Sequence, residues 1–435
     1  MRSVKIGLIG CGVVGEGFVD LLDKRKESIS ARVGAPVKII KIAVRDKSKK
    51  RGRHIDEALL TQDPFEVVNS PEVNIVVEVM GGEDPALKLM LKAAENGKSI
   101  VTANKHLLAL HGERVCQAVE SAKVELGFEA AVAGAVPIIN SLKGPFAGDG
   151  IVSIQGIVNG TCNYILSRMT DEGCSFADAL NEAQTLGYAE ADPAFDVEGI
   201  DSAHKIAILA SLVFETPVDF ADINAEGITS ITQEDVAMAK EFGFRVKSLA
   251  IAKRAGDKID IRVHPAMIAG DNPIAKVNGA LNAIAIKGES AGMNMLVGPG
   301  AGAGPTASAV MGDVVEIARK ILSGSGNSLP MNVPVKSRKK LGILPINEVK
   351  TQFYLRLTVP DRPGVLAMIA GALGEFGVSI ASMIQRGREE NKPVSVVLMT
   401  HAANGADLAC AIEKIKTQNI LNAPAVAIRI ENGEK

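Results

Sequence analysis

The segment Val4-Lys5-Ile6-Gly7-Leu8-Ile9-Gly10-Cys11-Gly12-Val13-Val14-Gly15 decides the fold of this chain. Its first half is an apolar run of strand length. Its second half has the pattern G-x-G-x-x-G at the start of a helical stretch, which is the setting that a dinucleotide-binding turn requires. The first glycine permits the tight turn, the second lets a pyrophosphate approach the backbone, and the third lets helix and strand pack closely. The sequence therefore predicts a dinucleotide site with contacts from Gly10, Gly12, Val13, Val14 and Gly15.

Apolar runs alternate with helical stretches from residue 1 to about residue 130. This alternation is typical of a doubly wound parallel sheet, so we expect an α/β Rossmann domain over residues 1–135. The glycine-rich segment 298–305 precedes another helical stretch and offers backbone N–H groups to a ligand, so we expect the chain to return to this domain near residues 300–320. The expected elements are, in order, 4–9, 13–28, 37–44, 54–60, 74–79, 85–96, 99–103 and 106–121.

Two further domains are expected after Pro137. Longer helices over 175–187 and 199–214, mixed with strands such as 151–158 and 259–264, predict an α+β domain over residues 136–321. Residues 322–349 lack a sustained periodicity, which is typical of a linker. The order strand, helix, strand, strand, helix, strand then predicts a ferredoxin-like domain over residues 350–435. Its expected strands are 353–359, 378–386, 393–400 and 424–431, and its expected helices are 363–376 and 405–417.

Composition and charge exclude several classes of partner. The net charge is only -2, Trp is absent and three Tyr are present, so no basic aromatic surface for nucleic acid is expected. No apolar run approaches the roughly 18 residues that a membrane span needs, and no secretory signal is recognisable, so we expect a cytoplasmic protein without a membrane partner. The five cysteines form no C-x-x-C pair, which argues against disulfides and zinc.

The end of the second expected strand bears on the choice of cofactor. It ends in Arg45-Asp46, and a basic run follows. An acidic residue directly at this strand end would bind the ribose 2′-OH and repel a 2′-phosphate, whereas arginine can bind the phosphate bidentately. The sequence therefore favours NADP with Arg45 as a contact, while Asp46 leaves room for NAD. The basic run consists of Lys47, Lys49, Lys50, Arg51 and Arg53.

Several ionisable residues are candidates for catalysis. Lys105 follows a strand at the edge where open α/β sheets bind ligands, although its position alone also allows a solvated surface lysine. Asp201 and Lys205 are spaced i,i+4, which is equally the spacing of a surface ion pair. The apolar run after Lys205 nevertheless implies burial, and Glu190 precedes the pair in a turn; buried ionisable groups often mark a functional site. On a helix His204 is directed away from Lys205, and we assign it no catalytic role.

Six short motifs follow one another along the chain. They are G-x-G-x-x-G at 10–15, E-V-M-G-G at 78–82, T-A-N-K at 102–105, N-G-T-x-N-Y-I-L at 159–166, L-G-Y-A-E-x-D-P at 186–193 and D-x-x-x-K at 201–205. Together they resemble the homoserine dehydrogenase family over nearly the whole chain. The resemblance implies reversible NAD(P)-dependent reduction of L-aspartate 4-semialdehyde to L-homoserine, in threonine and methionine biosynthesis. It also implies that residues 136–321 are a catalytic and dimerisation domain.

The same resemblance implies roles for individual residues. Lys205 would donate or accept the proton, with Lys105 as a second catalytic lysine that touches substrate and cofactor; the sequence leaves open which lysine transfers the proton. Glu190 and Asp201 would bind the amino end and the hydroxyl or aldehyde end of the substrate, and Asp201 belongs to the catalytic set. The other expected cofactor contacts are Thr102, Lys105, Gly187 and Gly302, and Gly187 would also touch the substrate.

Residues 128–137 resemble the family's loop in which backbone carbonyls hold a sodium ion at a hinge between domains. A hard cation with oxygen ligands suits such carbonyls. A purely structural hinge is the alternative. The family's S-V-G-G-G reads Ala-Val-Ala-Gly-Ala at residues 131–135 of this chain, which departs from the pattern. The implied ligands are Glu129, Val132, Gly134 and Val136.

Residues 358–366, Thr-Val-Pro-Asp-Arg-Pro-Gly-Val-Leu, resemble the first strand and loop of ACT domains, small modules that bind amino acids and pair across sheet edges. The resemblance implies an amino-acid effector, threonine being expected, at the loop from Asp361 to Gly364. It also implies feedback inhibition and a homodimer or homotetramer. A module that only dimerises is the alternative.

Three rival functions fit parts of the sequence. 3-Phosphoglycerate dehydrogenases also join a Rossmann domain to an ACT domain, but their nucleotide domain is inserted rather than N-terminal. Aspartate-semialdehyde dehydrogenases need a cysteine nucleophile with a base, and none of the five cysteines has that setting. An inactive amino-acid sensor is disfavoured because Lys105, Glu190, Asp201 and Lys205 are all present.

Overall fold

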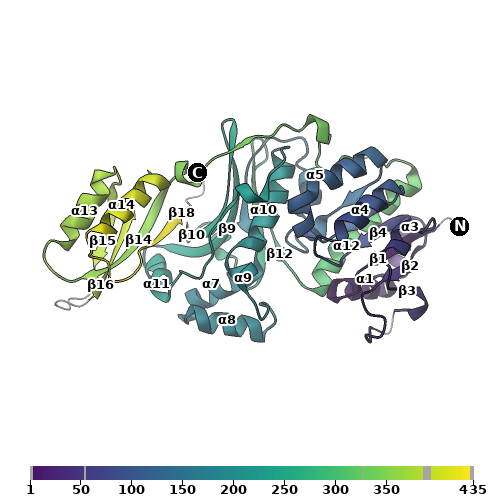
Figure 1. Ribbon diagram of the computed structural model, residues 1–435, viewed down its shortest axis with the longest axis horizontal. Coiled ribbons are helices and arrows are strands. Elements are labelled where there is room, and N and C mark those ends of the chain that lie inside the picture. Colours follow the sequence, from purple (N-terminus) through teal and green to yellow (C-terminus); the bar gives the residue numbers. More distant parts are fainter. Residues whose placement is uncertain (1–2, 53–54, 327, 386–392, 432–435) are drawn as a thin grey trace. The chain divides into compact units, whose positions relative to one another are not determined.

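The computed structural model of the protein describes residues 3–52, 55–326, 328–385 and 393–431 (Figure 1). The chain folds into two compact units, each assembled from separate stretches of sequence. Unit 1 comprises Met1–Gly160, Ala203–Ile223 and Leu281–Leu341, and unit 2 comprises Thr161–Ser202, Asn224–Ala280 and Gly342–Lys435. In the part of the chain that is described, no helix is both long and apolar enough to cross a bilayer.

Unit 1 is built on a parallel sheet with the strand order β3-β2-β1-β4-β5-β6. The central strands are almost wholly buried, which is why their sequences are continuous apolar runs. The predicted doubly wound parallel sheet is confirmed. Its strands are β1 (Val4–Ile9), β2 (Val37–Ala43), β3 (Leu60–Thr61), β4 (Ile75–Glu78), β5 (Ser99–Thr102) and β6 (Leu126–Gly127).

Helices cover both faces of this sheet, and two of them differ from the sequence-based expectation. The helix expected over 13–28 ends at Lys24, because Arg25 leaves the helical conformation (φ -117°, ψ 16°) before a second helix begins. The helix expected over 54–60, whose first residue lies outside the described part of the chain, is wrong over residues 55–60. The Asp56 side chain accepts from the N–H of Ala58 in a single 3-10 turn, and Leu60 then pairs with β2. The helices are α1 (Val13–Lys24), α2 (Lys26–Val33), α3 (Phe65–Asn69), α4 (Ala86–Glu95) and α5 (Lys105–Ala122).

A long helix from much later in the chain, α12 (Ala303–Ser323), packs against α1 (Figure 1). Val310 and Val314 of α12 share the apolar core with Phe18 of α1 and with the sheet. The backbones of α1 and α12 approach closely at Gly17: a Cβ atom there would lie only 3.0 Å from the carbonyl oxygen of Ala303. The C-terminal stretch of unit 1 thus completes the dinucleotide-binding fold.

The remainder of unit 1 contains a short helix, three antiparallel strands and most of a further helix. It contains α6 (Ile138–Lys143) and the antiparallel strands β7 (Ile151–Ile157), β11 (Leu281–Gly288) and β12 (Gly292–Pro299), with β11 in the middle. Helix α10 (Ile200–Val213) brings residues 203–213 into this unit.

Unit 2 is built around strands that pair in the order β9-β10-β18-β14-β16-β15. β9 (Phe244–Ala255) and β10 (Lys258–Ala269) form a long hairpin. The last part of the chain has the predicted order β14 (Lys350–Pro360), α13 (Val365–Glu375), β15 (Ile380–Gln385), β16 (Pro393–Thr400), α14 (Gly405–Thr417) and β18 (Val426–Ile430), so the ferredoxin-like fold is confirmed. The expected strand 378–386 ends in a residue outside the described part of the chain.

The ferredoxin-like part joins the sheet of the hairpin, because β18 pairs in parallel with β10 through Ala266–Arg429 and Met267–Ile430. Tyr354 shares an apolar core with the helices of unit 2. Its hydroxyl donates to Asp235, 3.0 Å away, and Arg356 donates to both oxygens of the same carboxylate, at 2.6 and 3.0 Å. The helices are α7 (Gly160–Glu172), α8 (Phe176–Thr185), α9 (Ala194–Val197) and α11 (Gln233–Glu241), and the short strands are β8 (Asn224–Ala225), β13 (Gly342–Ile343) and β17 (Ala403–Asn404).

Candidate active site and cofactor cleft

The turn between β1 and α1 has the geometry that its glycines predict. A side chain at Gly10 (φ 95°) would place Cβ 2.7 Å from the backbone of Met80, and one at Gly15 would place Cβ 2.4 Å from the carbonyl oxygen of Gly10. At Gly12, the N-cap of α1, a Cβ would meet no atom within 4 Å, and no side chain caps the helix. Open space in front of an uncapped helix start fits the pyrophosphate of a dinucleotide.

A cleft of about 640 Å³ extends from this turn along the ends of β1, β2 and β4. Arg45, Lys49 and Arg51 lie together at the β2 end, where a 2′-phosphate would be bound. The carboxylate of Asp46 accepts from the N–H and hydroxyl of Ser48 at 2.8 and 2.7 Å, and these bonds lower its pKa. Arg53 lies outside the described residues. The lining is Ile9, Gly10, Cys11, Gly12, Ala43, Val44, Arg45, Asp46, Lys49, Arg51, Gln62, Pro64, Val79, Met80 and Pro85.

The E-V-M-G-G and T-A-N-K motifs are bonded to each other at the carboxyl ends of β4 and β5. The fully buried Glu78 accepts from the hydroxyl of Thr102 at 2.6 Å and from the backbone N–H groups of Met80 and Gly81 at 2.9 and 3.1 Å. Burial raises the pKa of this carboxyl. Thr102, predicted as a cofactor contact, therefore also supports the neighbouring loop. Glu78 was not predicted as a site residue, although an acid that ends the apolar strand 75–78 was a usable signal.

Lys105 is the first residue of α5, directly after the N-cap Asn104. The Asn104 side chain accepts from the N–H of Leu107 at 3.1 Å and donates to the carbonyl of Gly82 at 2.8 Å. These two bonds fix the start of the helix to the loop after β4. The position of Lys105 at the carboxyl end of β5 is thereby set by the backbone, in the place where open α/β sheets bind ligands.

Lys205 lies in α10 and is only 8% exposed. Its ammonium Nζ donates to the carbonyl oxygen of Val158 at 2.6 Å, and the buried Asn282 side chain donates to the same oxygen at 3.0 Å. A Cβ at Gly300 would lie 2.2 Å from Asn282, so only glycine fits there. Asn282 was not predicted, and no local pattern singles out an isolated asparagine in a strand.

Three of the predicted substrate residues belong to unit 2. Asp201 stands in the first turn of α10 and is 2% exposed. Glu190 is exposed in the turn after α8, where its carbonyl oxygen accepts from Gln184 at 3.0 Å. Gly187 has a φ of 76°, which explains the glycine at that turn. Asn163 of the N-G-T-x-N-Y motif donates to the carbonyls of Val277 and Gly279, a structural role.

Gly302 and the predicted sodium loop lie in adjoining segments of unit 1. Gly302 is the N-cap of α12, with a φ of 117°. Ala135 donates from its N–H to the carbonyl of Pro299 at 3.1 Å, and a Cβ at Gly134 would lie 2.5 Å from the carbonyl oxygen of Gly300. The glycine-rich segment predicted from the sequence therefore supports the 132–136 turn.

The carboxylate of Glu129 accepts from the backbone N–H groups of Ile139 and Asn140, both at 2.8 Å, and so caps α6. Ala133 and Gly134 both have a φ of 54°, which turns the chain tightly between Val132 and Val136. Ala133 occupies a position where the family pattern has glycine, and a left-handed alanine costs roughly 1 kcal/mol. Backbone oxygens in such a turn suit a hard monovalent cation.

The ferredoxin-like part has a cavity of about 320 Å³ around Asp361–Gly364. Gly364, with a φ of 92°, is the N-cap of α13, and no side chain caps that helix. Gln385 donates to Asp361 Oδ1 at 3.1 Å, whereas Asp361 Oδ2 is buried without a partner among the described residues. A carboxylate acceptor next to an uncapped helix start is complementary to the ammonium and carboxylate of an amino acid.

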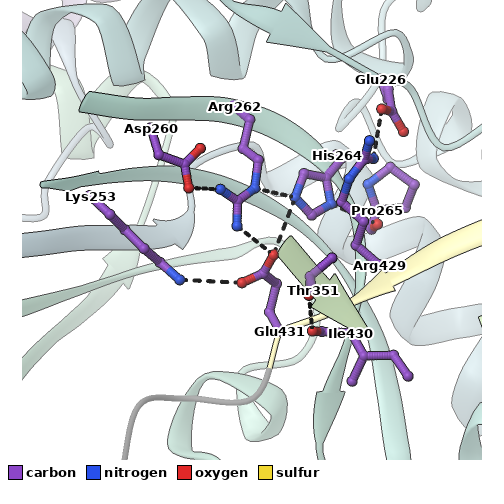
Figure 2. Close-up of polar contacts among 10 residues, drawn as sticks. All are labelled: Glu226, Lys253, Asp260, Arg262, His264, Pro265, Thr351, Arg429, Ile430 and Glu431. Atoms are coloured by element: carbon purple, nitrogen blue, oxygen red, sulfur yellow. Dashed lines mark hydrogen bonds and ion pairs between the residues drawn. The ribbon is translucent and has the colours of Figure 1, made fainter. Parts of the chain in front are cut away.

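A cluster of buried charges lies where β10 meets β18, and Figure 2 shows its contacts. Glu431 accepts from Arg262 at 2.6 Å and from Lys253 at 3.3 Å, and Arg262 also bonds to Asp260. Burial alone would raise the pKa of Glu431, but Arg262, Lys253 and His264 hold it at about 2. Opposite charges thus join the hairpin to the last strand.

The parallel sheet, the glycine turn and the cleft together define a dinucleotide-binding enzyme, and the comparisons with known proteins place it more narrowly. Family models match as the NAD binding domain of homoserine dehydrogenase over residues 10–129, homoserine dehydrogenase over 137–315 and the ACT domain over 353–418. The chain belongs to the homoserine dehydrogenase family, and it is an oxidoreductase with that activity.

Relatives are similar along the whole chain. A homoserine dehydrogenase of Neisseria gonorrhoeae is 41% identical over 435 residues, covering 99% of both chains, and one of Mycobacterium tuberculosis is 42% identical over 440 residues, covering 99% of this chain and 98% of that protein. The crystal structure of a homoserine dehydrogenase from Thiobacillus denitrificans has a TM-score of 0.92 at 42% identity and 99% coverage of both chains. A hyperthermophilic archaeal homoserine dehydrogenase in complex with NADPH has a TM-score of 0.63 at 28% identity, over 73% of this chain and 98% of that one.

Proposed function

We propose that the protein reduces L-aspartate 4-semialdehyde to L-homoserine with NADPH as the preferred cofactor, and that threonine inhibits it through the ACT domain. Residues 136–321 would form the catalytic and dimerisation domain of a homodimer or homotetramer. The observation that carries the catalytic assignment is the buried Lys205, whose Nζ is held 2.6 Å from the carbonyl of Val158. Buried ionisable groups beside a cofactor domain often belong to a functional site.

The proton is the part of the reaction that the protein itself must supply. When bound, NADPH provides the hydride for the aldehyde carbon. The Lys205 ammonium donates a proton to the oxygen that becomes the hydroxyl, and the neutral amine takes it back in the reverse direction. The Val158 carbonyl accepts one N–H of the ammonium and so orients the group. Lys105, at the start of α5, is proposed as the second catalytic lysine, in contact with substrate and cofactor.

Substrate recognition is assigned to the acidic residues. Glu190 and Asp201 are proposed to bind the amino end and the hydroxyl or aldehyde end, with Gly187 alongside. The burial of Asp201 in the first turn of α10 supports its place in the catalytic set. The backbone carbonyls of Glu129, Val132, Gly134 and Val136 are proposed to hold a sodium ion, a role that suits the tight turn at Ala133 and Gly134.

The cofactor preference rests on Arg45. Arg45→Ala is expected to lower kcat/KM for NADPH about ten- to hundredfold and to leave kcat/KM for NADH nearly unchanged, because only the 2′-phosphate loses a charge-assisted bond of about 1.5–3 kcal/mol. Steady-state kinetics with both cofactors measure this. Lys41→Ala, which removes a cation from the same strand outside the cleft lining, is the matched control. An equal loss with both cofactors would contradict the assignment.

Inhibition by threonine rests on Asp361. Wild-type activity is expected to fall as threonine is added, and Asp361→Ala is expected to raise the half-inhibiting concentration at least about tenfold, because the effector ammonium loses a charged acceptor. Asp407→Ala, which removes another ACT-domain carboxylate that bonds to Asn404, should respond like the wild type. A wild-type enzyme that responds to no amino acid of the aspartate family would refute inhibition.

A further inference from the structure

Two histidine side chains meet in unit 1, each next to a lysine in sequence. His106 is in the first turn of α5 and His204 is in α10, 98 positions later. Nδ1 of His106 lies 3.3 Å from Nε2 of His204. The rings meet edge to face, with centroids 5.0 Å apart and planes inclined at 78°. The contact therefore joins the start of α5 to α10.

His204 is also held on a second side. Its ring stacks on Phe220, with centroids 4.3 Å apart and an angle of 12° between the planes, and the residue is only 2% exposed. Phe220 belongs to a 3-10 turn that the Asp219 side chain caps by accepting from the N–H of Ala221. The ring of His204 is thus held in place on α10, and the less buried His106 packs against it.

The two imidazoles can share one hydrogen bond, because one ring nitrogen can donate its N–H to the lone pair of the other. Such a contact is directional, unlike apolar packing, and it fixes both the distance and the orientation of the elements that carry it. Both rings lie one residue from a proposed catalytic lysine, since Lys105 precedes His106 and Lys205 follows His204.

Neighbouring side chains on a helix diverge by about 100°, so the histidines can hold the two helices without filling the space that the lysines need. Lys205 is itself fixed on the Val158 carbonyl. A shift of α5 against α10 would therefore change the separation of the two ammonium groups, and with it their mutual repulsion and their approach to the reacting oxygen.

We propose that the His106–His204 contact is a positioning device that sets the separation of Lys105 and Lys205 for catalysis. This inference rests on the proposed roles of the two lysines. The histidines themselves touch neither substrate nor cofactor in this scheme, and neither of them lines the cofactor cleft.

The test uses the full-length enzyme. His106→Ala is expected to lower kcat about ten- to hundredfold, the scale that a misplacement of about 1 Å can cause, while the KM for the cofactor changes less than about twofold. His106→Asn, whose amide can occupy the place of Nδ1, should recover kcat to within about threefold of the wild type. A merely structural role would give neither this split between kcat and KM nor this rescue.

The matched control is His111→Ala in the same helix, where the ring contacts Glu83 at 2.7 Å instead; it should retain wild-type kcat. His204→Gln combined with His106→Ala should be no slower than the slower single variant, because both remove one interaction. Thermal unfolding of every variant checks that the fold is kept.

Two outcomes overturn the inference alone: a His106→Ala enzyme with wild-type kcat, or a His106→Asn enzyme as slow as His106→Ala, in each case with Lys205→Ala inactive. A Lys205→Ala enzyme that keeps its activity would overturn the lysine roles, and this inference with them.

Discussion

Replacing Lys205 with alanine is expected to lower kcat for semialdehyde reduction by about a thousandfold, within the range of about 10²–10⁴ that a positioned acid or base contributes. Lys205 is 8% exposed and its Nζ is fixed by the Val158 carbonyl, so water has little access to replace it as the proton donor. The KM for NADPH should change little, because Lys205 does not line the cofactor cleft. Steady-state and single-turnover kinetics in both directions measure this loss.

Lys98→Ala is the matched control for this variant. Lys98 is also buried in unit 1 and also donates to a backbone carbonyl, that of Val73 at 3.0 Å. Its loss should lower the stability of the fold without a comparable loss of kcat. If the kcat of Lys205→Ala stayed within about tenfold of the wild type, Lys105 or solvent would have to supply the proton. This result would contradict the assignment of Lys205 as the proton donor.

Glu431→Gln is expected to lower the free energy of unfolding by about 3 kcal/mol at neutral pH, because the carboxyl has a pKa of about 2 in the folded protein against its ordinary value of 4.5. A depressed pKa means that the folded state binds fewer protons than the unfolded chain. The stabilisation is therefore fully present above about pH 4.5 and is lost as the pH falls towards 2. Urea unfolding of wild type and variant over this range should show two curves that converge in acid.

Glu226→Gln provides the control, and Figure 2 shows both carboxylates. Glu226 accepts from Arg429 at 2.7 Å, but its side chain is 40% exposed, so solvent screens the pair. Its loss should cost well under about 1 kcal/mol. If the two variants were equally stable at neutral pH, the buried cluster would contribute no more than a surface pair, and the expected stabilisation of about 3 kcal/mol would be refuted.

Local sequence was sufficient for most of the helices and strands and for the cofactor turn. The glycines at 10, 12 and 15 predict the turn because each has its own steric reason. The first permits a tight bend, the second leaves the approach to the backbone open, and the third allows helix and strand to pack closely. The order of strands and helices over residues 353–430 predicts the ferredoxin-like fold, because apolar periodicity is a local property. The helix expected over 54–60 failed because a short polar stretch has too little periodicity to outweigh the Asp56 cap and pairing with β2.

Contacts between distant residues could not be predicted in this way. Lys205 meets the carbonyl of Val158, 47 positions away, and Glu78 meets Thr102, 24 positions away. The motifs named these residues or their neighbours, but the bonds depend on which strand ends adjoin. Asn282 carried no local signal at all, since its importance comes from the Val158 oxygen and from the close backbone at Gly300.

By itself, the sequence determined the class of fold, the dinucleotide turn and the set of ionisable residues, because these follow from spacing along one chain. The sequence predicted that the chain returns to the Rossmann domain near residues 300–320, but only the tertiary structure decided that α12 packs there against α1. It also decided that β18 extends the sheet of β10 and that His106 meets His204. Each of these contacts is one of many long-range pairings that the chain could form. Which pairing forms depends on how whole faces pack and on whether buried polar groups find partners, and neither can be read from a local stretch of sequence.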